Sequence, residues 1–396
     1  MPNQVKLGLA VLLALCCLQT RADQISNLLV EAYKSGEVED SVDSGATSYG
    51  LERLVPVQSI EYHYGAEENE SNRTHIFRLK MKSFREMTTA SESHRLSQEL
   101  KDLTQKSAVN QVAFEAHRQV VESILHSQLL HVISQRQKET DRLINRKLHL
   151  LSESRSSAKE LLRESLGSQQ LQGQLAIVQG ALVGKEEISS AKAESLTQTL
   201  VSRASRLANK IKRSALQSQE LRRQQLAARL EHIDKEVDWA NDSKILSQVD
   251  FRYDSENREN SFRVGFNIPF ARFDRSKKER ESALLRSKEA IGQVKQQETK
   301  REVEERAARV QSLAEALRIS QEKLAQIAAV KQRLRKSKDA EVLLAIRQSL
   351  YEMNKEVAEL ALEFYLTYLT HLRDLGEFSA KESVNFLDPS WAALKR

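Results

Sequence analysis

Gln248-Val-Asp-Phe-Arg-Tyr253 and Phe262-Arg-Val-Gly-Phe-Asn-Ile268 are two short stretches in which apolar and polar residues alternate, with a polar loop between them. The same arrangement occurs earlier in the chain, as Ser59-Ile-Glu-Tyr-His-Tyr64 followed by Ile76-Phe-Arg-Leu-Lys-Met-Lys82. Residues that correspond at one constant offset are Ile60 with Val249, Tyr64 with Tyr253, Phe77 with Phe266, and Leu79 with Ile268. This register predicts two copies of one unit, each a β-hairpin that leads into a long helix.

The sequence after each strand pair is typical of very long helices. It contains neither glycine nor proline from Arg85 to Leu166, or from Gln293 to Leu375. Since these two residues are the strongest helix breakers, both runs are free to continue as helix. A helix of about 70 residues would be on the order of 100 Å long. We therefore predict a mainly α protein with a small β part.

Apolar residues within these runs recur at three- and four-residue spacing, which predicts coiled-coil packing. Two polar breaks, Ser152–Ser157 and Arg335–Asp339, each precede a leucine pair and predict tight turns that reverse the chain. The result is two antiparallel helical hairpins. A third break, Leu182–Ile188, separates a further helical stretch over about residues 192–241.

These signals divide the chain into seven segments. The predicted segments are residues 1–22, an export signal; 23–56, a short N-terminal segment; 57–83, the first β-hairpin; 84–243, the first helical hairpin with equatorial and return helices; 244–270, the second β-hairpin; 271–376, the second helical hairpin; and 377–396, a C-terminal tail. The tail is polar, and we expect it to be loosely held.

The export signal is predicted from a basic start at Lys6, an apolar core from Leu7 to Leu18, and small residues before Asp23. Cys16 and Cys17 are the only cysteines and lie inside this signal, so the exported chain would have no disulfide and no thiolate metal site. Lipidation at Cys16 or Cys17 is disfavoured, because neither follows the small residue typical of lipoproteins.

Composition excludes several classes of function. The net charge is only +6, and basic residues are interspersed with acidic ones rather than gathered beside aromatic residues, so nucleic acid is not an expected partner. The sequence contains no phosphate-binding glycine loop, no zinc-protease motif and no nucleophile elbow. His126 and His131 are five residues apart, which does not align them as metal ligands on a helix. We expect neither an enzyme nor a cofactor.

Alternation with a period of two places the strand side chains in two sets on opposite faces. A half-buried strand of a soluble sandwich shows the same pattern, but the aromatic weighting and the export signal favour a membrane wall. The predicted lipid-facing residues are Tyr62, Tyr64, Phe77, Phe251, Tyr253, Phe262 and Phe266. The predicted pore-lining residues are Glu61, His63, Arg78, Lys80, Lys82, Asp250, Arg252, Arg263 and Asn267. Basic residues outnumber acidic ones in this second set, which either favours anions or merely keeps a wide pore wetted.

Four strands cannot close a barrel, and an open sheet edge cannot be left in lipid because its backbone groups would be unpaired. A membrane role therefore predicts an oligomer. Three chains would supply twelve strands around a water-filled lumen.

With these features, the chain resembles the TolC family of outer-membrane efflux proteins. The most similar stretch is Asp242–Lys278, with its strand, polar loop, strand ending Ile268-Pro-Phe270, and basic helix start. Leu343–Tyr351 resembles the sequence after the family's periplasmic turn, and Leu182-Val-Gly184 resembles the marker before its equatorial region. The resemblance implies a homotrimer, with a twelve-stranded barrel in outer-membrane lipid and a helical tunnel in the periplasm of a Gram-negative bacterium.

The chain departs from the family in its first half, where residues 23–56 offer only a short helical piece, Ile25–Tyr33, in place of a longer helix. The turns also lack the glycine that is common in the family. By the resemblance, the turns would meet a periplasmic adaptor and could gate the tunnel. The residues expected at this mouth are Arg155, Lys159, Lys336, Lys338 and Asp339.

The predicted function is an outer-membrane exit duct of a tripartite efflux or type I secretion system, working with a periplasmic adaptor and an inner-membrane pump. Two alternatives stay open. A periplasmic adaptor would have one helical hairpin set into β-domains with many strands, and a secreted coiled-coil scaffold would not need aromatic strand faces repeated in one register.

Overall fold

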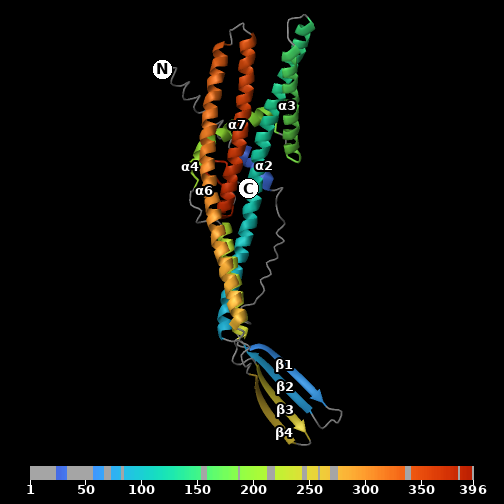
Figure 1. Ribbon diagram of the computed structural model, residues 1–396, viewed down its shortest axis with the longest axis vertical. Helices are drawn as coiled ribbons and strands as arrows, with labels where there is room; N and C mark the ends of the chain where they lie inside the picture. The colour runs from blue at the N-terminus through green and yellow to red at the C-terminus, as the bar shows by residue number, and fades with distance from the viewer. Residues whose placement is uncertain are drawn as a thin grey trace. The chain divides into compact units, whose positions relative to one another are not determined.

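The computed structural model describes residues 24–33, 57–66, 73–81, 84–152, 158–185, 188–211, 219–242, 248–256, 259–267, 275–334, 340–381 and 384–394 (Figure 1). Most of these residues are helical, and four strands form one sheet. The predicted fold class, long helical hairpins with two β-hairpins, is confirmed. The predicted export signal lies outside the described residues.

The sheet consists of β1 (Val57–Ala66), β2 (Arg73–Met81), β3 (Gln248–Glu256) and β4 (Glu259–Asn267). Its strand order is β1-β2-β3-β4, and every neighbouring pair is antiparallel. Each predicted hairpin is present, and the two hairpins join through the pairing of β2 with β3. Strands β1 and β4 therefore form the two edges of the sheet.

The four longest helices are α2 (Phe84–Ser152), α3 (Ala158–Leu182), α6 (Arg275–Arg333) and α7 (Ala340–Leu375). Helix α2 has 69 residues and α6 has 59, as the absence of glycine and proline led us to expect. Helix α3 runs back along α2, and α7 runs back along α6. Both predicted helical hairpins are thus present.

The chain divides into two compact units. The first comprises residues 1–38, 107–217 and 300–396, and the second comprises residues 39–106 and 218–299. Helices α2 and α6 contribute residues to both units.

In the first unit the four long helices follow the order α3, α2, α7, α6 (Figure 1). Between α2 and α3, the Gln137 amide donates a hydrogen bond to the Ser168 hydroxyl at 2.7 Å. Between α2 and α7, the Asn110 amide donates to the carbonyl oxygen of Arg373 at 2.7 Å. Between α7 and α6, the Ser320 hydroxyl donates to Glu356 at 2.9 Å. Helices α3 and α6 therefore lie at the two open flanks.

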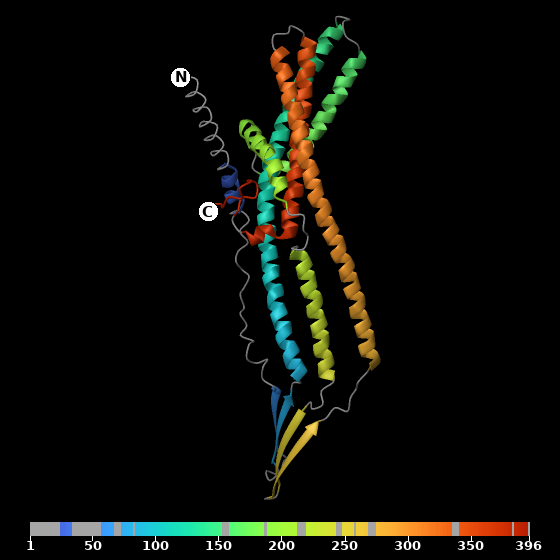
Figure 2. The ribbon, with the colours of Figure 1, turned by 90° about the vertical axis from the view of Figure 1, so that its left-hand side faces the viewer.

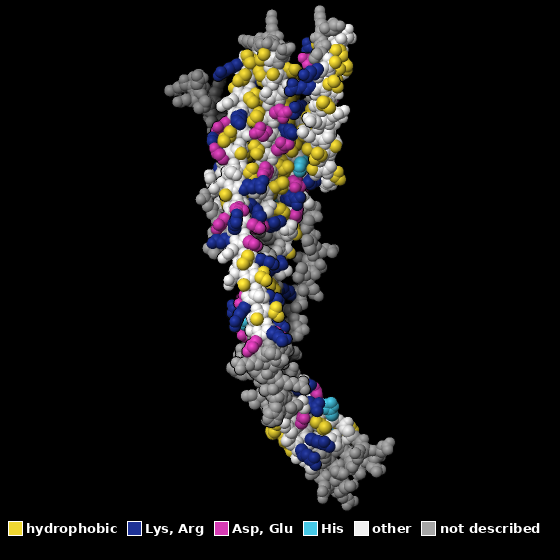
Figure 3. Space-filling view, viewed as in Figure 1, with side chains coloured by type: hydrophobic (Ala, Val, Ile, Leu, Met, Phe, Trp, Pro, Cys, Tyr) yellow, Lys and Arg dark blue, Asp and Glu magenta, His cyan; other side chains and the backbone are white. Residues whose placement is uncertain are grey.

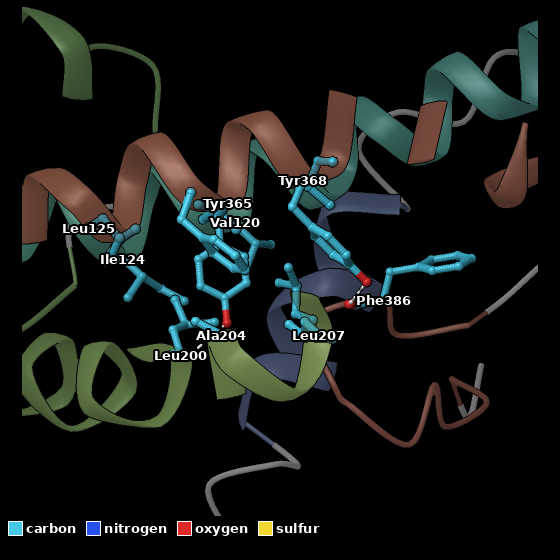
Figure 4. Close-up of a cluster of buried hydrophobic side chains, with 14 of the residues drawn as sticks. Val120, Ile124, Leu125, Leu200, Ala204, Leu207, Tyr365, Tyr368 and Phe386 are labelled. Carbon is cyan, nitrogen blue, oxygen red and sulfur yellow. Dashed lines mark hydrogen bonds between the residues drawn. The ribbon is translucent and has the colours of Figure 1, made fainter. Parts of the chain in front are cut away.

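The core of this unit gathers where α4 (Ser190–Asn209) packs against α2 and α7. Two tyrosines of α7, Tyr365 and Tyr368, are fully buried among aliphatic side chains of the other two helices (Figure 4). The Tyr365 hydroxyl donates to the carbonyl oxygen of Leu200 at 2.7 Å, and the Tyr368 hydroxyl donates to that of Phe386 at 3.3 Å. Burial raises the pKa of both phenols.

The C-terminal tail belongs to this core, so the expectation that it is loosely held is wrong. It begins with the short helix α8 (Glu377–Ala380), and it buries Phe378, Phe386 and Leu387 almost completely. The short helix over residues 24–33, which falls where a helical piece was predicted, buries Ile25 and Leu29 in the same cluster. The two ends of the described chain are thus packed into one core.

The helical stretch predicted over about residues 192–241 is two helices rather than one. Helix α4 ends at Asn209, and α5 spans Gln219–Asp242. Ile211, just beyond the end of α4, is buried in the core.

In the second unit, α5 lies beside the first turns of α2 and α6 (Figure 2). Arg229 of α5 pairs with Glu92 of α2 at 2.6 Å, and Lys288 of α6 forms an ion pair with Glu231 of α5. Both pairs join exposed side chains, so each contributes little to stability on its own.

Candidate functional site

The sheet has two faces of opposite character, and the strand register fixes which residues share a face. Tyr62 lies opposite Phe77, and Phe77 lies opposite Phe251. One residue away on each of these strands, Glu61 lies opposite Arg78, and both belong to the other face. Because neighbouring strands stay in step, every residue predicted to face lipid falls on one face, and the described residues predicted to line the pore fall on the other.

The apolar face is aromatic and exposed in the single chain. The exposed fraction of its side chains reaches 52% for Tyr62, 48% for Phe77 and 64% for Phe262. Phe251 is half-buried between its neighbours. An exposed apolar surface of this kind marks contact with a membrane or with another protein.

His75 also lies on the apolar face, although the sequence did not single it out. Its Nδ1 atom is 2.7 Å from the Tyr62 hydroxyl, and its ring lies 5.1 Å from Tyr64 and 6.1 Å from Tyr253. These side chains combine an apolar ring with a polar tip, which is the residue type enriched at membrane interfaces. The signal that could have found it is position, since His75 is two residues before Phe77 on the same strand.

The polar face carries a network of ion pairs that joins the two hairpins. Arg78 of β2 lies 3.2 Å from Asp250 of β3 and 3.5 Å from Glu61 of β1. Lys80 also pairs with Glu61, and His63 Nε2 lies 3.7 Å from the same carboxylate. Opposite charges on neighbouring strands stabilise the pairing of those strands.

The middle of the polar face carries more positive than negative charge. Its cations are Arg78, Lys80, Arg252 and Arg263, and its anions are Glu61 and Asp250. Four positive charges less two negative charges leave +2 for each chain in this middle part, without His63. Towards the β3–β4 loop, the register puts the acidic positions Asp254, Glu256 and Glu259 on the same face.

Several predicted site residues cannot be placed. Lys82, Arg155, Lys336, Lys338 and Asp339 lie outside the described residues. Asn267 ends β4, but its side chain is not described. Lys159 is exposed in the first turn of α3. Of the five residues predicted at the turns, it is the one that falls within the described residues.

The core around His117 was not predicted as a site. His117 of α2 is fully buried and contacts the rings of Tyr33, Phe378 and Phe386. Its Nδ1 atom lies 2.8 Å from the carbonyl oxygen of Ala113, so Nδ1 carries the proton. Its Nε2 atom then accepts a hydrogen bond from the Phe386 backbone amide at 3.3 Å. Burial lowers the pKa of His117 to about 4.

A buried carboxylate, Glu122, fixes the segment between α3 and α4 to α2. It accepts hydrogen bonds from Lys185 at 2.6 Å and from Arg118 at 2.9 Å. Burial acts to raise the pKa of Glu122, but these two cations outweigh it and hold the pKa below its usual value. Lys185 follows Gly184, whose φ of +78° is a left-handed conformation that suits glycine. This is the segment that resembles the family's marker before the equatorial region.

Among the described residues, no helix contains a stretch long and apolar enough to span a membrane. No three histidine, cysteine or acidic residues among them are grouped closely enough to hold a metal ion.

No protein-family model matches this chain, and no curated protein matches it in sequence. Solved structures do match its fold. The open state of the MtrE outer membrane channel of Neisseria gonorrhoeae has a TM-score of 0.54 and 11% identity, with 91% of this chain and 86% of that chain covered. CusC, whose structures concern folding and transmembrane channel formation, has a TM-score of 0.53 and 12% identity, with coverage of 90% and 88%. The CmeC outer membrane channel of Campylobacter jejuni has a TM-score of 0.52 and 8% identity, with coverage of 91% and 85%.

MtrE and CmeC are outer membrane channels, and the CusC structures concern the formation of a transmembrane channel. The fold is therefore that of a bacterial outer-membrane channel protein. More narrowly, it is the fold of the TolC family, as the sequence resemblance led us to expect. At these identities, the likeness establishes the fold alone.

Proposed function

We propose that this protein is the outer-membrane exit duct of an export system in a Gram-negative bacterium. Three copies assemble so that their sheets form a twelve-stranded barrel in the outer membrane and their helical hairpins form a tunnel in the periplasm. Drugs, metabolites or polypeptides pass through this duct without any chemistry by the protein itself.

The observation that carries the proposal is the two-faced sheet with its two edges, β1 and β4. Edge strands in lipid must be paired, because water is absent there to satisfy their backbone groups. The strands of one chain alternate in direction from β1 to β4, so β4 of one copy and β1 of the next can continue the antiparallel pattern. Closure in this way puts the aromatic face outward and the charged face inward.

The partners follow from the same arrangement. A passive duct needs energy from elsewhere, which an inner-membrane pump supplies through a periplasmic adaptor. The adaptor docks at the two helical turns, where Arg155, Lys159, Lys336, Lys338 and Asp339 form the periplasmic mouth. Docking there shifts the tunnel from closed to open, because it favours the open state over the closed one.

Cell fractionation and single-channel recording test this proposal. We expect the protein in the outer-membrane fraction, as a complex that runs at the mass of three chains on gels without boiling and at one chain after boiling. The purified complex should conduct ions in planar bilayers. A soluble periplasmic protein without conductance would overturn the proposal, and would favour an adaptor or a coiled-coil scaffold instead.

A further inference from the structure

The apolar face of the sheet changes character along its strands. The register places the residues of this face in rows that cross all four strands. From the helix end towards the hairpin loops, the first row is Ile60, Leu79, Val249 and Phe266, and the second is Tyr62, Phe77, Phe251 and Val264. The third row is Tyr64, His75, Tyr253 and Phe262, and the fourth is Ala66, Arg73, Ser255 and Asn260. The face therefore turns from apolar to polar towards the loops.

Arg73 is the one lysine or arginine among these sixteen positions. It stands in the row next to that of His75, two residues away on the same strand, which is about 7 Å. Cations are expected on the opposite, charged face, and Figure 3 shows dark blue and magenta side chains over the described part of the sheet. An arginine on the aromatic face is a separate feature that needs its own explanation.

The length of β2 places this arginine at the edge of the membrane. The strand runs from Arg73 to Met81, and the two end residues lie on the same face. The eight residue steps between them correspond to about 27 Å along the strand, or about 21 Å in height for a strand tilted by about 40°. The outward apolar band of an outer-membrane barrel is about 25 Å tall. The rows of His75 and Arg73 therefore lie where acyl chains give way to headgroups.

This boundary belongs to the outer leaflet. The helices lie at the opposite end of the strands, since β2 leads into α2 and β4 leads towards α6. In the proposed duct these helices are in the periplasm, so the hairpin loops point out of the cell. Phosphate is the common anionic group of lipid headgroups, and it lies at the level of the third and fourth rows.

The surroundings of His75 suit a phosphate group. The Tyr62 hydroxyl lies 2.7 Å from Nδ1 of His75, and when it donates to that atom, the ring proton is on Nε2 and is available to an outside acceptor. The rings of Tyr64 and Tyr253 lie 5.1 and 6.1 Å from the imidazole, and both side chains are exposed. Phosphate oxygens accept hydrogen bonds from such groups, and arginine pairs with phosphate through two parallel bonds.

We propose that Arg73 and His75 bind the phosphate group of an outer-leaflet lipid, with the tyrosines beside His75 as further donors. This proposal rests on the proposed function, since it needs the sheet in the outer membrane with its aromatic face outward. The occupant is a lipid rather than a free phosphate ion, because the site adjoins the apolar rows of Phe77 and Leu79, along which acyl chains would lie. Each trimer carries three such sites.

Native mass spectrometry of the purified trimer in detergent tests the site. The probes are phosphatidic acid and diacylglycerol with identical acyl chains, which differ only in the phosphate group. We expect up to three molecules of phosphatidic acid to stay bound to each trimer, and diacylglycerol to be lost. Equal retention of the two lipids would overturn the proposal. This comparison uses the unaltered protein, so it does not depend on the folding of a variant.

Inorganic phosphate distinguishes the two sources of the same chemical group. Added at the same concentration as phosphatidic acid, it should leave the bound lipid in place, because it makes no contact with the apolar rows. Displacement of the lipid by inorganic phosphate would mean that the site takes the free ion, and would overturn the assignment to a lipid.

Substitutions test the two named residues. Arg73→Gln and His75→Phe should each weaken the binding of phosphatidic acid by about tenfold or more, the contribution of one hydrogen bond to a charged group. Arg73→Lys keeps the charge and should retain most of the binding. Arg95→Gln is the matched control, since Arg95 is an exposed residue of α2 and this change removes one positive charge outside the sheet. Equal binding by Arg73→Gln and Arg95→Gln would contradict the proposal.

Migration on gels with and without boiling, and conductance in planar bilayers, report the duct separately. A conducting trimer that retains lipids regardless of their phosphate group would overturn this site and leave the duct intact. A soluble monomer would overturn the proposed function as well.

Discussion

The backbone amide of Phe386 donates a hydrogen bond to Nε2 of His117, although the two residues are 269 positions apart in sequence. The bond holds the C-terminal tail to α2 and requires a neutral imidazole, because a protonated Nε2 has no lone pair to accept it. The stability of this core should therefore depend on pH.

Acid should destabilise the core through His117. Its pKa is about 4 when folded and 6.5 ordinarily, so between these values the unfolded chain binds more protons than the folded chain. The stabilisation is complete above pH 6.5 and is lost as the pH falls towards 4. The difference between these two pKa values corresponds to about 3 kcal/mol of stability. Thermal unfolding followed by circular dichroism at pH 7.5 and pH 4.5 measures it.

The control for this prediction is His117→Phe, which removes the titrating group and keeps an aromatic ring. The variant should be less stable at neutral pH and less sensitive to acid. The other titratable or charged groups around this core are Tyr33, Arg373, Glu377 and Lys381, with His371 on α7 and the Arg203 and Asp388 pair. An unchanged acid response in His117→Phe would assign the effect to these groups.

Loss of the buried carboxylate of Glu122 should release the segment between α3 and α4. Glu122→Gln leaves Lys185 and Arg118 without their shared anion, and breaking a buried pair costs about 3 kcal/mol. Glu115→Gln is the matched control, because Glu115 also pairs with Arg118, at 3.6 Å, but is well exposed. Its cost should stay below about 1 kcal/mol. Similar denaturation midpoints for the two variants would contradict a structural role for Glu122.

The strand faces could be predicted from sequence because alternation has a period of exactly two residues. Once Phe77 and Arg78 are assigned to opposite faces, the whole strand follows. The helices could be predicted because neither glycine nor proline interrupts them. In both cases the prediction depends on residues that are neighbours in sequence. Contacts with residues far away in the chain do not alter the result.

The core around the tail could not be predicted in this way. Phe386, Leu387 and Leu394 follow neither a helical nor a strand period, and they are buried by residues hundreds of positions away. His117 likewise looked like one of several scattered histidines on a long helix. Sequence separation hides such contacts, since nothing near His117 in the chain indicates which backbone amide it will accept from.

The charge on the inner face of the proposed barrel should set the ion selectivity. Arg263→Glu makes the charge of that face more negative by two for each chain, because a positive side chain is replaced by a negative one. We expect the reversal potential in a salt gradient to shift towards cation permeation. Arg263→Lys keeps the charge and should leave the reversal potential unchanged. If Arg263→Glu has no effect, the polar face only keeps a wide pore wetted.

Two adjacent residues of β2 test which face of the sheet meets lipid. Phe77 lies on the aromatic face, and Ile76 lies on the charged face opposite Arg252. Phe77→Lys should destabilise insertion by about 2–4 kcal/mol, the cost of lysine near the middle of a bilayer. Ile76→Lys makes a comparable change of apolar to charged and should be tolerated, because its side chain faces water in the lumen. The fraction of each variant recovered as a boiling-sensitive trimer from outer membranes measures the difference. Equal recovery would mean that the aromatic face does not contact lipid, and the reverse order would mean that the two faces have been assigned the wrong way round.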